Sequence, residues 1–391
     1  MRTNRREFCV KKEVDAGQSV APMAITDVPV RIRVGDTPAP DYDEFDAQEL
    51  QSTSSKRPIQ ITKRVMGFNI SHLLRGSGAV ATPPIISDLL EMGMLLKEVL
   101  RTVPIGAITN GPYLDGALFT GLTSGAVGRV FRTTTSGAAA LLYVVVSGTV
   151  SSGEILRVGA AGAQATTSAV SAVAGTLYKL TDSDFVDVAD TKHHCTCELR
   201  QDGFYWRGRG MLSDVSFAFR NGQPCIVSHA IIGALDDQGD EPLFGLTAFP
   251  QESVPAARFL DAGIKIGAYQ PTDVVDFSLA LKSNPEVRED ANDDNADGVL
   301  FADYDREAPI ITFDPAMVKA ATFDYFNTLF DGTTFAMEWQ LGTVAGNKWR
   351  FFADECQFVR VGADARRQLA TAPLEVRLNG NNNNELYIWH S

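Results

Sequence analysis

Short runs of alternating apolar and polar residues, separated by turn dipeptides, constrain this chain more than any other feature. In Val28–Val34 every second residue is Val or Ile, which places these side chains on one face of an extended strand. Turn pairs begin at Asp202, Asn221, Asp331 and Gly346. Further strand-like runs are Pro58–Ile70, Cys195–Leu199, Val215–Phe219, Val274–Leu281, Phe335–Leu341, Gln357–Val361, Leu374–Leu378 and Glu385–Trp389.

Helix signals occur in two places only. Thr82–Gly93 has Pro near its start, apolar residues at helical spacing and a closing Gly. Asp314–Gly332 has Asp as a candidate cap, Pro at the first helical position and Asp-Gly as a stop. Two short helices among many strands predict a mainly β (α+β) fold dominated by antiparallel sheet.

Three segments differ in composition from the rest. Ala117–Leu180 is rich in Gly, Ala, Ser and Thr, and its only acidic residue is Glu154, so it reads as a small β domain of its own. Glu286–Glu307 has nine acidic residues and two basic ones, which predicts an exposed loop. Pro38–Ser55 is also acidic and reads as a polar loop.

An internal duplication is predicted from two similar stretches of sequence. One surrounds Trp206 and the other surrounds Trp349, and each has a strand, a Gly-containing turn, a Trp-Arg pair and two further strands. The alternative is that any β-sandwich produces such hairpins. We therefore expect three domains: residues 1–116 with 181–240, an inserted small β domain at 117–180, and residues 241–391.

The charge and cysteine content restrict the function. The formal net charge is −13 and the pI is near 4.9, which disfavours a sequence-independent grip on nucleic acid. An acidic surface instead repels DNA and lets it pass. The five cysteines are an odd number, as expected for free thiols in a reducing cytoplasm. No apolar run is long enough for a membrane span, and no signal peptide is expected at the N-terminus.

No motif favours catalysis or a bound cofactor. His193, Cys195 and Cys197 alternate as three possible metal ligands, but no second ligand pair follows, and only Cys225 and His229 are near. A strand with half-buried cysteines is the preferred interpretation. Asp290–Gly298 is rich in oxygen ligands without the spacing of a calcium loop, so a solvated loop is expected. We expect no catalytic residues, no cofactor, no metal site and no enzyme.

The C-terminal half carries a resemblance to a known family. The segments that carry it are the strand after Gly332, the turn Gly346–Trp349, the strand Glu355–Val361 and the closing run Asn384–Ile388. Together they resemble the end of bacteriophage tail tube proteins. Pro58–Ile70 with the following Gly76-Ser77-Gly78 and helix looks like the matching segment of a first tube domain, and Asp202–Leu235 like its end.

This resemblance implies a virion structural protein of a long-tailed phage. Chains with two tube domains form trimeric, pseudo-hexameric rings that stack into a tube, which holds the tape-measure protein and later passes DNA. Tail-tip and tail-terminator proteins are the further implied partners, and assembly is expected in the host cytoplasm. The loops, the sheet edges and the N-terminal arm, Met1–Gly17, are expected to carry assembly.

Two alternatives stay open at this point. The first is a tail-tip or terminator protein that forms one ring without stacking. The second is a carbohydrate-binding β-sandwich adhesin with residues 117–180 as its binding module. The adhesin would need an exposed aromatic platform, and the aromatic residues of that segment are Phe119, Phe131, Tyr143 and Tyr178.

Overall fold

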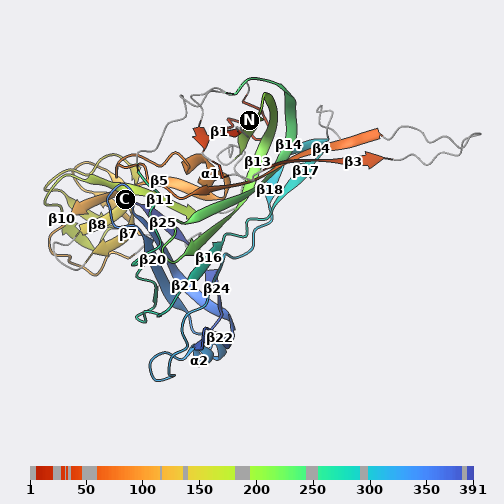
Figure 1. Cartoon of the computed structure of the whole chain (residues 1–391). Helices are drawn as coiled ribbons and strands as arrows, with labels where there is room; N and C mark the ends of the chain where they lie inside the picture. The colour runs from red at the N-terminus through yellow and green to blue at the C-terminus, as the bar shows by residue number, and fades with distance from the viewer. Residues whose placement is uncertain are drawn as a thin grey trace, which may run out of the picture.

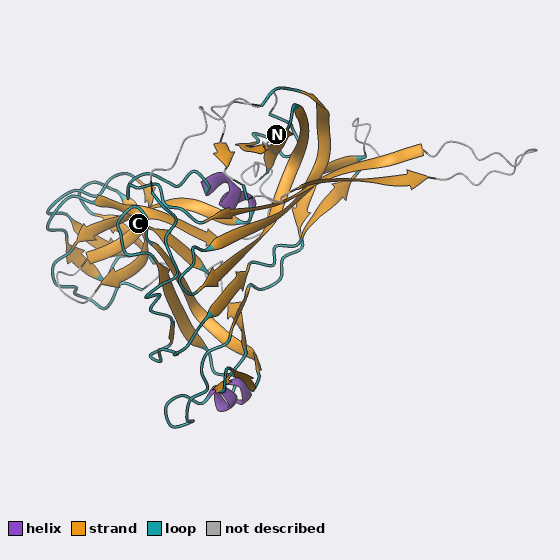
Figure 2. Cartoon of the chain, viewed as in Figure 1, coloured by secondary structure: helices purple, strands orange, loops and turns teal. Residues whose placement is uncertain are grey.

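The prediction of a mainly β fold is confirmed by the structure. The computed structural model describes residues 6–20, 28–30, 32–33, 37–45, 60–114, 117–134, 140–180, 194–243, 254–290, 298–380 and 385–391. Within these ranges almost all regular structure is strand, and the two helices have six residues each. Figure 2 shows strands through most of the molecule, with loops and helix α2 at its lower tip.

The first group of strands forms an antiparallel sheet in the order β2-β1-β12-β13-β14-β4-β3. Helix α1 contacts β1 and β13. The bounds are β1 Arg6–Lys12, β2 Val28–Val30, β3 Thr37–Phe45, β4 Gln60–Leu73, α1 Ser87–Met92, β12 Cys195–Gln201, β13 Phe204–Arg220 and β14 Ile226–Asp240.

The second group has the order β15-β20-β21-β24-β19-β16, and β16 pairs with β13 of the first group. Strand β25 continues the line of β24 along β21. The bounds are β15 Lys265–Ile266, β16 Asp276–Ala280, β17 Pro285–Glu289, β18 Val299–Tyr304, β19 Ile310–Phe313, α2 Tyr325–Phe330, β20 Phe335–Leu341, β21 Trp349–Val361, β22 Asp364–Arg366, β23 Leu369–Thr371, β24 Leu374–Asn379 and β25 Tyr387–His390.

A third group forms the lobe on the left of Figure 1, in the order β11-β5-β8-β7-β6-β9-β10. Strand β11 also pairs with β25, which joins this lobe to the second group. Because β5 pairs within the lobe, its strands begin before residue 117, the expected start of the inserted domain. The bounds are β5 Leu95–Pro104, β6 Leu118–Gly121, β7 Val127–Thr134, β8 Ala140–Ser147, β9 Ile155–Val158, β10 Gln164–Thr166 and β11 Ala172–Leu180.

One of the two predicted helices is much shorter than expected. The Asp314-Pro315 start was wrong, because Ala316 forms an isolated bridge with Thr371 and the chain is not helical there. Helix α2 begins only after Asp324, whose carboxylate accepts a hydrogen bond from the Asn327 backbone N–H at 3.0 Å. The predicted first helix is confirmed over Ser87–Met92 and ends at Gly93.

Both acidic segments predicted as loops contain strands. Strand β3 occupies Thr37–Phe45 of the first, and residues 46–55 lie outside the described residues. In the second, β17 and β18 form a two-stranded hairpin, and residues 291–297 lie outside the described residues. The composition misled because a few apolar residues suffice to anchor the second hairpin: Val299 and Ala302 of β18 are fully buried, and β18 contacts β13 and β14.

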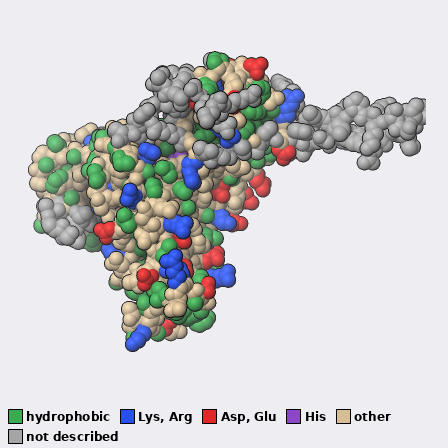
Figure 3. Space-filling view, viewed as in Figure 1, with side chains coloured by type: hydrophobic (Ala, Val, Ile, Leu, Met, Phe, Trp, Pro, Cys, Tyr) green, Lys and Arg blue, Asp and Glu red, His purple; other side chains and the backbone are tan. Residues whose placement is uncertain are grey.

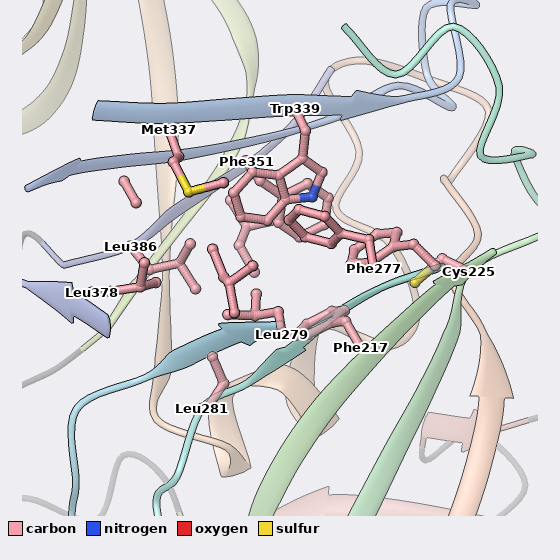
Figure 4. Close-up of a cluster of buried hydrophobic side chains, with 14 of the residues drawn as sticks. Phe217, Cys225, Phe277, Leu279, Leu281, Met337, Trp339, Phe351, Leu378 and Leu386 are labelled. Atoms are coloured by element: carbon pink, nitrogen blue, oxygen red, sulfur yellow. The ribbon is translucent and has the colours of Figure 1, made fainter. Parts of the chain in front are cut away.

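The largest apolar core is shared by the first two groups of strands. Figure 4 shows Phe217 of β13, Phe277 of β16, and Trp339 and Phe351 of β20 and β21 converging on one space. Trp339 stacks on Phe351 with ring centroids 5.0 Å apart. A separate cluster fills the inside of the left lobe, around Phe119 and Tyr143. In the described part of the chain, no helix has the length and apolarity to cross a membrane.

Candidate assembly surface

The same strand order occurs twice in this chain. The first repeat reads β1-β12-β13-β14-β4-β3 across its sheet, and the second repeat reads β15-β20-β21-β24-β19-β16. In each, the six strands take the same places along the sequence, and a short helix precedes the fourth of them. This repeated order is what the predicted internal duplication requires. Trp206 and Trp349 lie near the start of the equivalent strands β13 and β21.

The two repeats are joined by direct strand pairing. The last five residues of β13, Ser216–Arg220, pair antiparallel with β16, from Ser216 opposite Ala280 to Arg220 opposite Asp276. The result is one sheet of eight strands, four from each repeat, in the order β3-β4-β14-β13-β16-β19-β24-β21. We call this the eight-stranded sheet.

The two faces of the eight-stranded sheet differ sharply near the joint. On one face Phe217, Phe219 and Phe277 are buried in the shared core. The opposite face carries small or hydroxyl side chains, and Ser278 and Thr312 share a hydrogen bond there at 2.5 Å. Its two exposed charges at the joint, Arg220 and Asp276, lie 3.6 Å apart. We call this the open face.

The open face is hollowed. A depression of about 740 Å³ lies over the joint, with a lining that combines Arg220, Asp276, Thr312, Arg360 and Glu375. Asp314 and Asp364 also line it, so the depression has four acidic side chains against two arginines and is net acidic. Helices α1 and α2 both lie on the core side, because Leu90 and Tyr325 belong to the shared core. The eight-stranded sheet therefore has one face covered by the core and helices and one hollowed, open face.

Two hairpins project from the eight-stranded sheet at equivalent places. Strands β3 and β4 extend to the right in Figure 1, and β17 and β18 lie at their base. Lys63 of β4 and Glu289 of β17 are linked by an ion pair at 2.7 Å. The first hairpin consists of the second and third strands of its repeat, β3 and β4. The second hairpin, β17–β18, lies in the chain between the second and third strands of its repeat, β16 and β19. The described strands of both acidic segments singled out in the sequence therefore belong to these hairpins.

The two glycine turns quoted for the resemblance meet each other. The Gly78 backbone N–H donates to the Gly346 carbonyl oxygen at 2.8 Å, and the Gly76 N–H donates to the Asn347 side-chain oxygen at 3.0 Å. A Cβ atom on Gly76 would lie 2.2 Å from the Gly346 oxygen, so the backbones approach too closely for any other residue. This contact fixes the first repeat against the second.

The N-terminal arm was expected to be available for assembly, and that expectation was wrong for its described part. Strand β1 is an interior strand between β12 and β2, and Phe8, Cys9 and Val10 are fully buried. Residues 1–5 lie outside the described residues. Glu13 accepts hydrogen bonds from the Gly210 and Gly17 backbone N–H groups, and its burial raises its pKa to about 7.

The residues considered as metal ligands lie in different environments. Cys195 and Cys197 are buried in an apolar cluster, which raises the pKa of both thiols well above the ordinary value. Cys225 is buried in the shared core, and His193 lies outside the described residues. Among the described residues, no three His, Cys, Asp or Glu side chains come together as ligands would.

A buried histidine pair was not anticipated. His72 of β4 and His229 of β14 are each 2 % exposed, and their Nε2 atoms lie 3.0 Å apart. Burial lowers the pKa of His72 to about 4 and that of His229 well below its ordinary value. His229 also contacts the Ser213 hydroxyl through Nδ1 at 3.2 Å. One neutral imidazole therefore donates a hydrogen bond to the other, and burial disfavours the doubly protonated, charged form of either ring.

The histidine pair predicts a loss of stability in weak acid. Below pH 6.5 the unfolded chain protonates His72 while the folded chain does not, so stability falls as pH drops from about 6.5 to 4. This single shift corresponds to about 3 kcal/mol over that window. Thermal unfolding of the wild type and of His229→Gln at pH 7.5 and pH 5 measures this loss of stability. The stability of the variant should change less between the two pH values. Equal pH slopes would contradict it.

Comparison with protein-family models and with curated proteins gave no match.

Proposed function

We propose that this chain is the major tail tube subunit of a long-tailed bacteriophage, and that three copies form a pseudo-hexameric ring that stacks into a tube. The observation that carries the proposal is the repeated strand order within one continuous sheet. A chain that contains two equivalent units needs three copies to make a ring of six. The family resemblance of the sequence and the physical layout of the sheet favour the same assembly.

The open face of the eight-stranded sheet suits the inside of such a ring. Both helices contribute to the shared core on the other side, and so do Leu95, Tyr178 and Leu180 from strands of the left lobe. Closing the sheet with the open face inward therefore leaves them outside. The charged residues that line its depression are four acidic side chains and two arginines, so the open face offers DNA no basic grip. On the face seen in Figure 3, acidic and basic side chains are interspersed and no extended basic patch is visible.

The proposal includes partners and place. The tape-measure protein would occupy the channel before DNA does, and tail-tip and terminator proteins would close the two ends. The projecting hairpins β3–β4 and β17–β18 would reach the neighbouring ring in the stack. The protein would act as a virion component without catalysis or cofactor, assembled in the cytoplasm of the host bacterium.

The alternative adhesin is disfavoured by the burial of its candidate platform. Phe119, Phe131, Tyr143 and Tyr178 are at most 6 % exposed, so none of them can stack on a sugar from solution. In the proposed ring, the left lobe would decorate the outer surface and would not bind sugars. A tail-tip or terminator ring remains the second candidate, because it would use the same ring without stacking.

Electron microscopy of the purified recombinant protein, concentrated without partners, tests the proposal. We expect hollow rods or stacked rings with a central pore and threefold symmetry of the left lobe around the outside. Single rings that never stack would favour the terminator alternative. A protein that stays monomeric, even after addition of an extract containing tail-tip initiators, would contradict both.

A further inference from the structure

We propose that the pocket between β15, β20 and β21 binds an acidic sugar residue, and that the sugar carboxylate pairs with Arg350. The inference goes beyond the proposed function, because binding at this pocket requires no ring. The pocket lies in the second repeat and not in residues 117–180, the segment that the sequence suggested as a sugar-binding module.

The pocket has a volume of about 380 Å³, which is within the range of small-molecule sites. Its floor is a strand surface of paired polar side chains. Lys265 of β15 lies opposite Glu338 of β20, and Gln340 of β20 lies opposite Arg350 of β21. These four side chains therefore share one face of the sheet. Phe352 also lines the pocket.

The pocket and the open face lie on opposite sides of the shared core. Trp339 and Phe351 alternate with the pocket residues along β20 and β21, and both enter the core. On the far side of the core, Phe277 of the eight-stranded sheet lies with its ring 4.9 Å from that of Trp339. In the proposed ring, the pocket would therefore face outward, where a ligand from the surroundings reaches it.

Arg350 is a partly buried cation without an anionic partner. Among the described residues, its guanidinium forms no hydrogen bond and no ion pair, and it lies over the Trp389 ring at 4.8 Å from the centroid. Burial lowers the pKa of Arg350, and the charge of Glu338 acts in the opposite direction. Glu338 is itself paired with Lys265, so the N–H donors of Arg350 stay available to a ligand.

A second cation beside Arg350 adds to the demand for an anion. Lys348 comes two residues before Arg350 in the sequence and is partly buried as well. Burial and the charge of Arg350 both lower the pKa of Lys348. In the part of the chain that the structure describes, neither side chain forms an ion pair. A bound anion would relieve the repulsion between these two cations, and a planar carboxylate matches the fork of a guanidinium.

The other side chains of the pocket suit the hydroxyl groups of a sugar. The Gln340 amide both donates and accepts, the carboxylates of Asp261 and Glu338 accept, and Lys265 donates. Sugar hydroxyls also donate and accept, so several of them find partners here. Phe352 supplies an apolar wall for the C–H groups of the ring. A free phosphate ion would contact the cations but leave these groups without partners.

A matched pair of ligands tests the site on the unmodified full-length protein. We would titrate the protein with digalacturonate and with its methyl ester, which keeps the sugar rings but removes the negative charge, and follow binding by ligand-observed NMR. We expect digalacturonate to bind about tenfold more tightly than the ester, because a charge-assisted pair is lost with the ester. Arg350→Gln should weaken the binding of digalacturonate by a similar factor and leave that of the ester nearly unchanged.

Arg360→Gln is the control variant, because Arg360 is an exposed arginine of the same strand that lines the depression of the open face. It should bind digalacturonate as the wild type does. Equal binding of the acid and the ester, or full binding by Arg350→Gln, would overturn the inference. Inorganic phosphate that binds as tightly as digalacturonate would reveal a general anion site and overturn the assignment to a sugar. Absence of binding would also overturn the inference, while the proposed function would stand or fall on electron microscopy alone.

Discussion

Trp339→Ala should lower the stability of the whole chain by about 4 kcal/mol, within the range for removing a fully buried aromatic side chain. Trp339 is 2 % exposed, and its ring lies 4.9 Å from that of Phe277 and 5.0 Å from that of Phe351. Its indole N–H has no hydrogen-bond partner among the described atoms, so the loss is one of packing. Chemical denaturation followed by circular dichroism measures it.

The loss of stability caused by Trp339→Ala should extend beyond the second repeat. Phe219 belongs to the first repeat and its ring lies 6.4 Å from Trp339, so a cavity here loosens both sides of the joint. Trp206→Ala is the matched control, because Trp206 is only partly buried and packs on Phe204. If the two tryptophan variants lost equal stability, the shared core could not be the main support of the fold.

Glu198→Ala should lower stability by about 3 kcal/mol, since it leaves buried arginines without their carboxylate. Glu198 is fully buried, and its two oxygens accept hydrogen bonds from Arg200 at 2.6 Å and Arg207 at 2.8 Å. The arginines keep other partners, because Arg200 also contacts Glu241 and the Pro242 carbonyl oxygen. We therefore expect a loss of stability at the lower end of the range for removing one partner of a buried ion pair.

A surface ion pair provides the comparison for Glu198. Glu338→Ala removes the exposed pair with Lys265 and should change stability by less than about 1 kcal/mol. Glu198→Gln keeps the shape of the side chain, and its loss of stability should lie between those of Glu198→Ala and Glu338→Ala. Thermal unfolding of the three variants at one pH measures the order, and a Glu198→Ala protein as stable as Glu338→Ala would contradict the argument.

The strands with an apolar face were the part of the fold that could be predicted from the sequence. Phe335–Leu341 was predicted with its exact bounds, because its alternate residues Met337, Trp339 and Leu341 enter the core. Strand β3 and the hairpin β17–β18 were missed because these strands depend on pairing and on contacts with distant parts of the chain, such as the buried Val299 and the ion pair of Lys63 with Glu289. Their composition alone resembles that of a solvated loop.

The candidate assembly surface could be predicted only in outline. The sequence similarity around Trp206 and Trp349 predicted two equivalent units, but the joint depends on Ser216 lying opposite Ala280. Single-sequence patterns do not specify which distant strands pair. The Gly76 and Gly346 turns were noted for their resemblance, yet their mutual contact is visible only in three dimensions. The buried pair His72 and His229 gave no spacing signal, because the two residues come from neighbouring strands far apart in sequence.

Joining two equivalent units in one chain changes the thermodynamics of ring formation. Each free subunit that enters a ring gives up translational and rotational freedom, which opposes association by several kcal/mol. The pairing of β13 with β16 makes half of the proposed joints intramolecular, so this loss is incurred half as often as in a ring of separate units. Covalent linkage also lets the units diverge, since β5–β11 lie between α1 and β12 while no such insertion separates α2 from β20. A tube built this way would alternate decorated and bare positions around its circumference.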